Sequence, residues 1–344
     1  METSEKEKSR DANARAAAGA FLAGLKTKNE EKRIKTAKEL FKFVTGELKD
    51  EAPEYMQEFI SFLDNKSEQS AVHECISSPD LDEKKAGIFL IVCLAETSID
   101  GESNRVVRFA NFLLKELTLS SMDEAGMELA VRALAFLIQT SKSYAAELVE
   151  KCLDQCLEWL EQSNRNEQRR LASVLLAREL AMFTSTSFFL RANVFFKSIF
   201  TVLRDPKPQI RIASVNALHA ALTITSAREA KLKTEWYTKC YAEALNTLKL
   251  TELSKDDRTH SMLLVINELV RIADATFERT RLEALNIHQT ETSIATPIEW
   301  LTQPRVASTV ESSTARALVV ANFAEVRLLV FGNYSFYSFL KSLD

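Results

Sequence analysis

Glycine and proline are scarce in this sequence, with 7 Gly and 6 Pro among 344 residues. These two residues supply the positive-φ corners and tight turns of β-sandwiches, barrels and Rossmann sheets, so their scarcity disfavours those folds. It favours helices joined by short polar turns. Hydrophobic residues make up 46% of the chain, which is enough for a large continuous core.

Sequence signatures of catalysis are missing as well. There is no G-x-G-x-x-G, G-x-x-x-x-G-K, His-Arg-Asp or Asp-Phe-Gly, so a kinase would lack its phosphate cradle and its metal-binding carboxylates. No G-x-S-x-G marks a serine nucleophile, and no H-E-x-x-H pair places two imidazoles on one helix face. We therefore predict no catalytic, cofactor-binding or metal-binding residues and no cofactor. The four histidines are interpreted as packing or capping residues: His73, His219, His260 and His288.

The cysteines show no disulfide framework. They are odd in number and scattered through apolar surroundings, which is typical of a reducing compartment. Cys152 and Cys156 are four residues apart and share one helix face, where they could hold zinc or form a redox switch. Because no second Cys or His pair accompanies them, core packing is the favoured interpretation. The five are Cys75, Cys93, Cys152, Cys156 and Cys240.

Neither sign of charge dominates, since the chain has 44 Lys and Arg residues and 48 Asp and Glu residues. Such a chain has no global field that would collect nucleic acid or anionic lipid, so a protein partner is expected. The first residues lack the apolar stretch of a signal peptide. The most apolar stretch, 315–340, is interrupted by charged and amide residues, which argues against a transmembrane segment. A cytosolic or nuclear location follows.

A repeated helix start is the strongest positive signal. The segment Arg170–Val174 is echoed by Arg211–Val215 at an offset of 41 residues. Similar starts, an Asn or Asp followed by an acid and an apolar helical pattern, recur every 40 to 50 residues, with Pro206 and Pro208 filling one gap. This period is typical of two-helix HEAT or armadillo repeats. The starts are Asn29-Glu30, Asp82-Glu83, Asp123-Glu124, Asn166-Glu167 and Asp256-Asp257.

Apolar residues inside the repeats recur with a period close to 3.6, so each helix has one apolar face. A single helix pair cannot bury that face and must pack on the next pair. The predicted fold is therefore all-α, an α-solenoid of HEAT/armadillo-like repeats. We expect helices near 12–25, 29–49, 53–64, 66–77, 79–97, 103–118, 122–140, 143–162, 165–182, 186–203, 207–225, 227–250 and 256–285.

Four segments organise the chain. Residues 1–23 are expected to be a partly ordered segment with the first helix, and 24–285 the HEAT-repeat solenoid. In 286–313 the composition shifts to Thr, Ser, Gln and Pro, which indicates an irregular connection. An apolar carboxy-terminal helix is expected over 314–344.

Three further groups of residues have both a structural and a binding interpretation. A run of lysines from Lys26 to Lys42 is mixed with glutamates and lacks stacking aromatics, so an ion-paired solvated face is favoured over a lipid or nucleic-acid site. Trp159 and Trp236 could bind a partner, but core packing is favoured. Arg170 and Arg211 occupy equivalent repeat positions, where a ladder of contacts to the adjacent unit is favoured over partner contact.

Many short segments, in order and at matching spacing from about Gly24 to Ile272, share residue identities with one protein family. They are Gly24–Lys26, Asn29–Glu31, Ala37–Leu40, Arg108–Leu113, Leu157–Leu160, Arg165–Glu167, Arg169–Arg170, Arg178–Ala181, Phe188–Phe189, Asp205–Lys207, Ile210–Arg211, Trp236–Tyr237, Asp256–Arg258, His260 and Asn267–Ile272.

These segments resemble the amino-terminal HEAT region of the target of rapamycin (TOR) protein kinases, members of the phosphatidylinositol-3-kinase-related kinases. The resemblance implies a curved scaffold arm that contacts the Raptor subunit and a second TOR protomer in nutrient-responsive growth signalling. It also implies a cytoplasmic protein that is recruited to lysosomal or endomembrane surfaces within a complex, or that acts in the nucleus. The family places its kinase domain in a carboxy-terminal part that nothing in this chain matches, and beyond about Leu285 the resemblance ends.

Two other interpretations stay open. The chain could be an unrelated HEAT-repeat adaptor, such as a transport or phosphatase scaffold, or an enzyme with an unrecognised site. The sequence assigns no residue to partner binding, so the favoured prediction is a noncatalytic protein-interaction scaffold whose contact surface is unknown.

Overall fold

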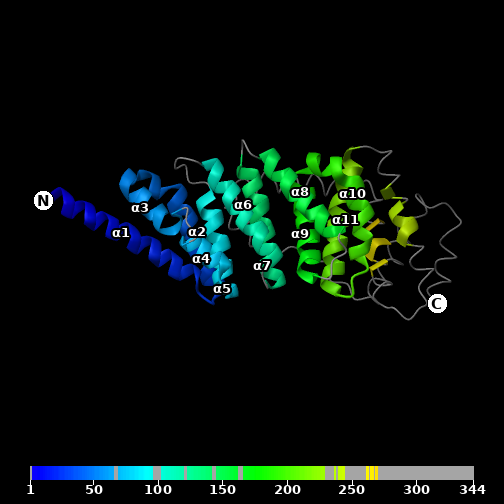
Figure 1. The fold of residues 1–344 in the computed structure, drawn as a ribbon, viewed down its shortest axis with the longest axis horizontal. Helices are drawn as coiled ribbons and strands as arrows, with labels where there is room; N and C mark the ends of the chain where they lie inside the picture. Colours follow the sequence, from blue (N-terminus) through cyan, green and yellow to red (C-terminus); the bar gives the residue numbers. More distant parts are fainter. Residues whose placement is uncertain are drawn as a thin grey trace. The chain divides into compact units, whose positions relative to one another are not determined.

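The computed structural model describes residues 2–65, 69–95, 102–119, 122–141, 145–161 and 166–228, followed by the short stretches 236–237, 239–244, 261–262, 264–266 and 268–269. Every regular element that it describes is a helix (Figure 1). In this part of the chain, no helix is both long enough and apolar enough to cross a membrane. The predicted all-α fold class is confirmed.

The helices and one 3₁₀ turn follow each other with short connections. Their bounds are α1 Glu2–Leu25, α2 Glu30–Thr45, η1 Glu47–Asp50, α3 Pro53–Leu63, α4 Ala71–Ser77, α5 Leu81–Ala95, α6 Glu102–Leu119, α7 Glu124–Thr140, α8 Ala145–Glu161, α9 Glu167–Phe183, α10 Ser185–Leu203 and α11 Pro208–Arg228.

Two compact units divide these elements. Unit 1 contains α1 to α7, α8 up to Cys156, and α9, and unit 2 contains the rest of α8 together with α10 and α11. Within unit 1, α2, α5, α7 and α9 pack in succession as one layer, while α1, α3, α4 and α6 form the layer beside it (Figure 1). Within unit 2, α10 packs against α11. Helix pairs stacked in this way are the architecture of an α-solenoid.

The central helices of unit 1 are buried along most of their length. Helix α5 is buried at every residue from Ala86 to Ala95, and α9 at every residue from Leu171 to Ala181. A single apolar face, as the sequence period predicts, would leave part of each helix exposed. These helices lie between neighbours in the stack instead, so charged residues such as Arg178 and Glu179 become buried with them.

Most helix ends agree with the prediction, and the differences have local causes. Helix α1 begins at Glu2 rather than near residue 12. The helix expected over 29–49 ends at Thr45, after which Gly46 leads into η1. Few described residues fall within the helices expected over 227–250 and 256–285. The segments 286–313 and 314–344 lie outside the described residues, so the predicted domain limits stay predictions.

Gly87 lies where two helices of unit 1 approach each other closely. A Cβ atom at Gly87 would lie 2.8 Å from the backbone nitrogen of Ile76 and 3.1 Å from Cβ of Cys75, so α4 and α5 pack backbone to backbone there. A Cβ atom at Gly19 in α1 would meet only the ring of Phe62, at 4.0 Å. An added methyl group would therefore fit at Gly19 but would clash with α4 at Gly87.

We expect Gly87→Ala to destabilise the chain by about 1–3 kcal/mol, because α4 must move away from α5. Gly19→Ala is the matched control and should stabilise it by about 0.5–1 kcal/mol, because alanine favours the helix. Urea unfolding followed by circular dichroism measures both. Equal stabilisation by the two substitutions would show that α4 and α5 are not in close contact.

Candidate functional site: the linked helix starts

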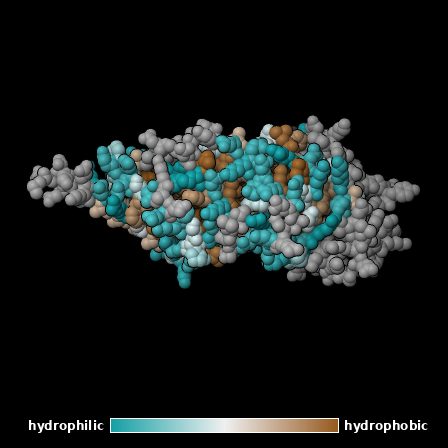
Figure 2. Space-filling model, in the orientation of Figure 1, coloured by the Kyte–Doolittle hydropathy of each residue, from teal (hydrophilic) through white to brown (hydrophobic). Residues whose placement is uncertain are grey.

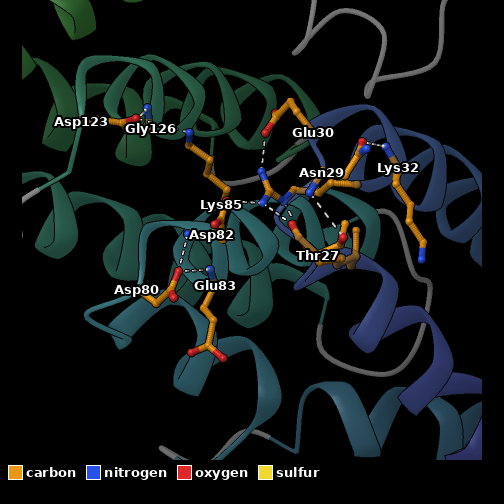
Figure 3. Close-up of polar contacts among 12 residues, drawn as sticks. Thr27, Asn29, Glu30, Lys32, Asp80, Asp82, Glu83, Lys85, Asp123 and Gly126 are labelled. Carbon is orange, nitrogen blue, oxygen red and sulfur yellow. Dashed lines mark hydrogen bonds and ion pairs between the residues drawn. The ribbon is translucent and has the colours of Figure 1, made fainter.

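Three helices of the layer that contains α2, α5, α7 and α9 begin with capping side chains (Figure 3). Oδ1 atoms of Asn29, Asp80 and Asp123 accept hydrogen bonds from amides in the first turns of α2, α5 and α7, at 2.9, 2.7 and 2.8 Å. Such caps satisfy amides that have no partner within the helix. The predicted starts at Asn29 and Asp123 are thus confirmed.

The predicted start at Asp82 is wrong by two residues. Asp80 caps α5, and Asp82 is the second residue of that helix. The error arises because both aspartates precede the same apolar run, and the sequence does not say which one leaves the helical conformation. In the structure the carboxylate of Asp82 is used to pair with Arg33 of α2.

Ion pairs join these starts from helix to helix (Figure 3). The Arg33 guanidinium of α2 pairs with Asp82 of α5. Lys85 Nζ of α5 then lies 3.3 Å from Oδ2 of Asp123, the cap of α7. The starts of α2, α5 and α7 therefore form one linked row, and each link fixes one helix pair against the next.

In α2 and α5, a cation at the fourth position of the helix donates a hydrogen bond to a carbonyl at the end of the preceding helix. Arg33 Nε donates to the carbonyl of Leu25 at the end of α1, at 3.1 Å. Lys84 Nζ donates to the carbonyl of Ile76 in the last turn of α4, at 2.9 Å, and pairs with Glu116 of α6 at 2.7 Å. Carbonyls at a helix end carry partial negative charge, so a cation satisfies them well.

Arg211 occupies the same fourth position in unit 2. Its Nη1 donates to the carbonyls of Asp205 and Pro206 at 2.9 and 2.8 Å. These carbonyls belong to the connection between α10 and α11, so the bonds hold that connection against α11. The ladder predicted for Arg211 is a contact to the adjacent repeat unit, which these two bonds are not. Arg170 is half-buried at the fourth position of α9, and its predicted ladder role stays a prediction. The Arg33 and Lys84 positions were missed by sequence reasoning. Counting four residues from the predicted start at Asn29 finds Arg33, but the same count from the predicted start at Asp82 gives Ala86 and misses Lys84.

Helices α7 and α9 share a partly buried ionic cluster. Glu128 Oε1 accepts hydrogen bonds from Arg132 and Arg178, both at 2.8 Å, and Arg178 also pairs with Glu179 at 3.0 Å. Burial raises the pKa of the Glu128 carboxyl, but attraction to Arg132 and Arg178 outweighs it, so the pKa is lowered from its ordinary value. The pairing allows these charges to remain ionised inside the stack.

The layer that contains α1, α3, α4 and α6 has a link of its own at Asp64, the residue that follows α3. The buried carboxylate accepts two hydrogen bonds from Arg108 of α6, at 2.6 and 2.7 Å, and lies 3.3 Å from Arg105. Arg108 also lies over the ring of Phe112, 5.8 Å from its centroid, and His73 of α4 packs on the same ring. His73 therefore has a packing role, as predicted.

The cysteines are all buried and free. Burial raises the pKa of the Cys152 thiol to about 12, and Cys156 Sγ donates to the carbonyl of Ser173 at 3.2 Å. Thiols of this kind ionise poorly and react slowly. Among the residues that the structure describes, no group of three or more His, Cys, Asp or Glu could hold a metal ion.

The remaining candidates also take structural roles. Trp159 and Trp236 are buried, and Trp236 stacks on Phe196 with 4.5 Å between ring centroids. In unit 2, His219 Nδ1 lies 2.7 Å from a carboxylate oxygen of Glu268. Core packing of both tryptophans is confirmed, while His260 and His288 lie outside the described residues.

The lysine-rich segment from Lys26 to Lys42 is partly ion-paired. Lys26 Nζ lies 3.0 Å from Glu83 Oε1, and Lys35 lies 3.9 Å from Glu39 on the solvent side of α2. Arg33 in the same segment is fully buried. These contacts agree with the predicted ion-paired face, except that Arg33 belongs to the interior.

Exposed apolar side chains are few among the described residues. The large ones are Phe62 and Leu190, and Leu190 of α10 is 74% exposed. In the face drawn in Figure 2, hydrophilic residues cover most of the coloured surface and hydrophobic ones occur in separate groups. A partner that binds this face would meet a largely polar surface with isolated apolar contacts.

We expect Arg33→Met to lower the free energy of unfolding by about 2–4 kcal/mol. The substitution leaves the Leu25 carbonyl without its donor inside the stack and leaves Asp82, which is 32% exposed, without its cation. Lys35→Met on the same helix is the control, because Lys35 is 78% exposed and should change stability by about 0.5 kcal/mol or less. Similar losses in both variants, measured by urea unfolding, would contradict the role given to Arg33.

Glu128 predicts a pH dependence. Because the pKa of Glu128 is lowered in the folded chain, its stabilisation is complete above the unfolded value of about 4.3 and is lost as the pH falls through the folded value. The stability advantage of the natural chain over Glu128→Gln should therefore shrink as the pH falls below about 4. Urea midpoints of both proteins between pH 3 and 7 test this, and a difference that stays constant would refute it.

Comparison with known proteins gives relatives of one kind. The chain is 43% identical to "Target of rapamycin homolog" of Caenorhabditis elegans, over 91% of the chain and 12% of that protein. It is 32% identical to "Serine/threonine-protein kinase tor1" of Schizosaccharomyces pombe, over 72% of the chain and 10% of that protein. The chain is also 32% identical to "Serine/threonine-protein kinase mTor" of Drosophila melanogaster, over 75% of the chain and 11% of that protein.

No protein-family profile matches the chain. The chain spans about a tenth of the length of the curated relatives that it matches. A match over 91% of the chain extends past Leu285, so the prediction that the resemblance ends there is wrong. In unit 1 the matched part folds into the helix stack described above. Over these residues, the chain belongs to the family of target of rapamycin kinases.

Proposed function

We propose that this chain is a noncatalytic protein-interaction scaffold of the TOR type, which contacts a Raptor-type subunit and a second TOR protomer. The observation that supports it most is the 43% identity with a TOR homolog across 91% of the chain. The sequence contains no kinase motif, so the role assigned to these residues is assembly rather than phosphoryl transfer.

The packing explains how such a scaffold would work. Buried cations such as Arg33 and Lys84 fix each helix pair against the next, so the outward-facing residues keep constant spacing. A partner can then bind several helices at once without paying for their ordering. The growth-signalling role and the cytoplasmic site of action, with recruitment to lysosomal or endomembrane surfaces or entry into the nucleus, come with this proposal.

We expect the purified chain to retain a Raptor-type subunit in a pull-down. The helical circular dichroism spectrum must be checked first, so that a failure to bind is not a failure to fold. Absence of retention by a folded chain would count against the proposal. Recovery of transport receptors or phosphatase subunits without TOR components would favour the alternative HEAT adaptor.

Leu190 offers a sharper test of the contact surface. It is the apolar member of an exposed stripe on α10 that also includes Thr186, Asn193, Lys197 and Thr201. If this stripe contacts the Raptor-type subunit, Leu190→Arg should weaken retention about tenfold, because a charge replaces an apolar contact. Thr201→Arg adds the same charge to the same face and should weaken it less. Equal retention by both variants and the natural chain would exclude α10 from the interface while leaving the scaffold role intact.

A further inference from the structure

The connection between α4 and α5 contains a serine followed by proline. Ser78, Pro79 and Asp80 separate the two helices; Pro79 and Asp80 are exposed and Ser78 is half-buried. Ser78 has φ −60° and ψ 145°, the extended conformation that a following proline favours. Within the part of the chain that the structure describes, this is the one Ser-Pro or Thr-Pro dipeptide. Its backbone thus already has the shape in which protein kinases bind their substrates.

The Ser78 hydroxyl connects to a link between helix pairs. Its oxygen accepts a hydrogen bond from the Asp80 amide at 3.1 Å. Interaction with the Ser78 hydroxyl and with Lys26 lowers the pKa of the Glu83 carboxyl. Glu83 Oε1 lies 3.0 Å from Nζ of Lys26, the residue that follows α1. The Ser78 hydroxyl therefore lies beside an ion pair that joins two helix pairs.

We propose that Ser78 is a phosphorylation site for a proline-directed serine/threonine kinase, and that the phosphate loosens the Lys26–Glu83 link. In the transfer, the Ser78 hydroxyl oxygen bonds to the γ-phosphorus of ATP and the bond from that phosphorus to the bridging oxygen breaks. ADP leaves with the electron pair, and a base of the kinase takes the hydroxyl proton. The proposal goes beyond the scaffold function and does not depend on which partner the scaffold binds.

The effect of the phosphate follows from charge. A phosphoserine carries about −1.5 to −2 charges. It repels the nearby Glu83 carboxylate and so weakens the pairing of that carboxylate with the Lys26 ammonium. Attraction to the amino-terminal end of α5 holds the phosphate in place, so the loss falls on the Lys26–Glu83 link rather than on the helix start.

The modification is tested on the full chain carrying Thr296→Ala, which removes the Thr296-Pro297 dipeptide. A cyclin-dependent kinase and Mg-ATP are added, and the phosphate is located by mass spectrometry. We expect one phosphate at Ser78, lost in Ser78→Ala and Pro79→Ala and kept in the neighbouring control Ser77→Ala. A peptide of residues 70–90 is the positive control. Phosphorylation of the peptide but not of the folded chain, or a phosphate at Ser77, would overturn the proposal.

Hydrogen–deuterium exchange tests the consequence. Amides at the end of α1 and around Lys26 should exchange about two- to fivefold faster in the phosphorylated chain, because one partly exposed ion pair is lost. In a Glu83→Gln background the repelled carboxylate is gone, so phosphorylation should change exchange there less than twofold. Unchanged exchange in the phosphorylated chain that keeps Glu83 would overturn the loosening, while the assignment of Ser78 as the modified residue would stand.

Discussion

The buried cation at the fourth position of a helix is the contact on which the stack depends. Arg33 and Lys84 each satisfy a carbonyl at the end of the preceding helix and also pair with an acid of another helix, Asp82 or Glu116. A buried cation without partners would cost several kcal/mol, so its contacts are made together or lost together. One side chain therefore sets both the geometry within a pair and the stacking between pairs.

This arrangement supports the proposed scaffold role. Several charged residues of the chain join one helix to another. Glu128 of α7 accepts a hydrogen bond from Arg178 of α9, and Asp64 accepts one from Arg108 of α6. Thiols such as Cys152 lie in the core with a raised pKa. In the proposed scaffold, the outward-facing residues bind partners, and the buried contacts determine their spacing. Such a division is typical of repeat proteins, in which neighbouring units stabilise each other.

The sequence predicted the helices well because caps and apolar periods are local signals, as at Asn29 and Asp123. It predicted partners of side chains less well. Arg33 stands among exposed lysines, so spacing alone suggests solvent, yet it is fully buried because α5 packs on that side. Asp82 likewise lies inside α5, whereas the sequence pattern predicts a helix start there. Which side of a helix faces a neighbour depends on tertiary packing, and a single helix does not contain that information.

Burial also decides which links can be adjusted. The Arg33 side chain is 0% exposed, so its contact with Asp82 is hard to change without unfolding the stack. Lys26 and Glu83, which join the same helix pairs, are 33% and 35% exposed. An ion pair at such a position contributes about 1 kcal/mol or less, and solvent can replace it. A modification near Glu83 can therefore alter how the pairs contact each other while the buried cation keeps them together, and regulation without unfolding needs this combination.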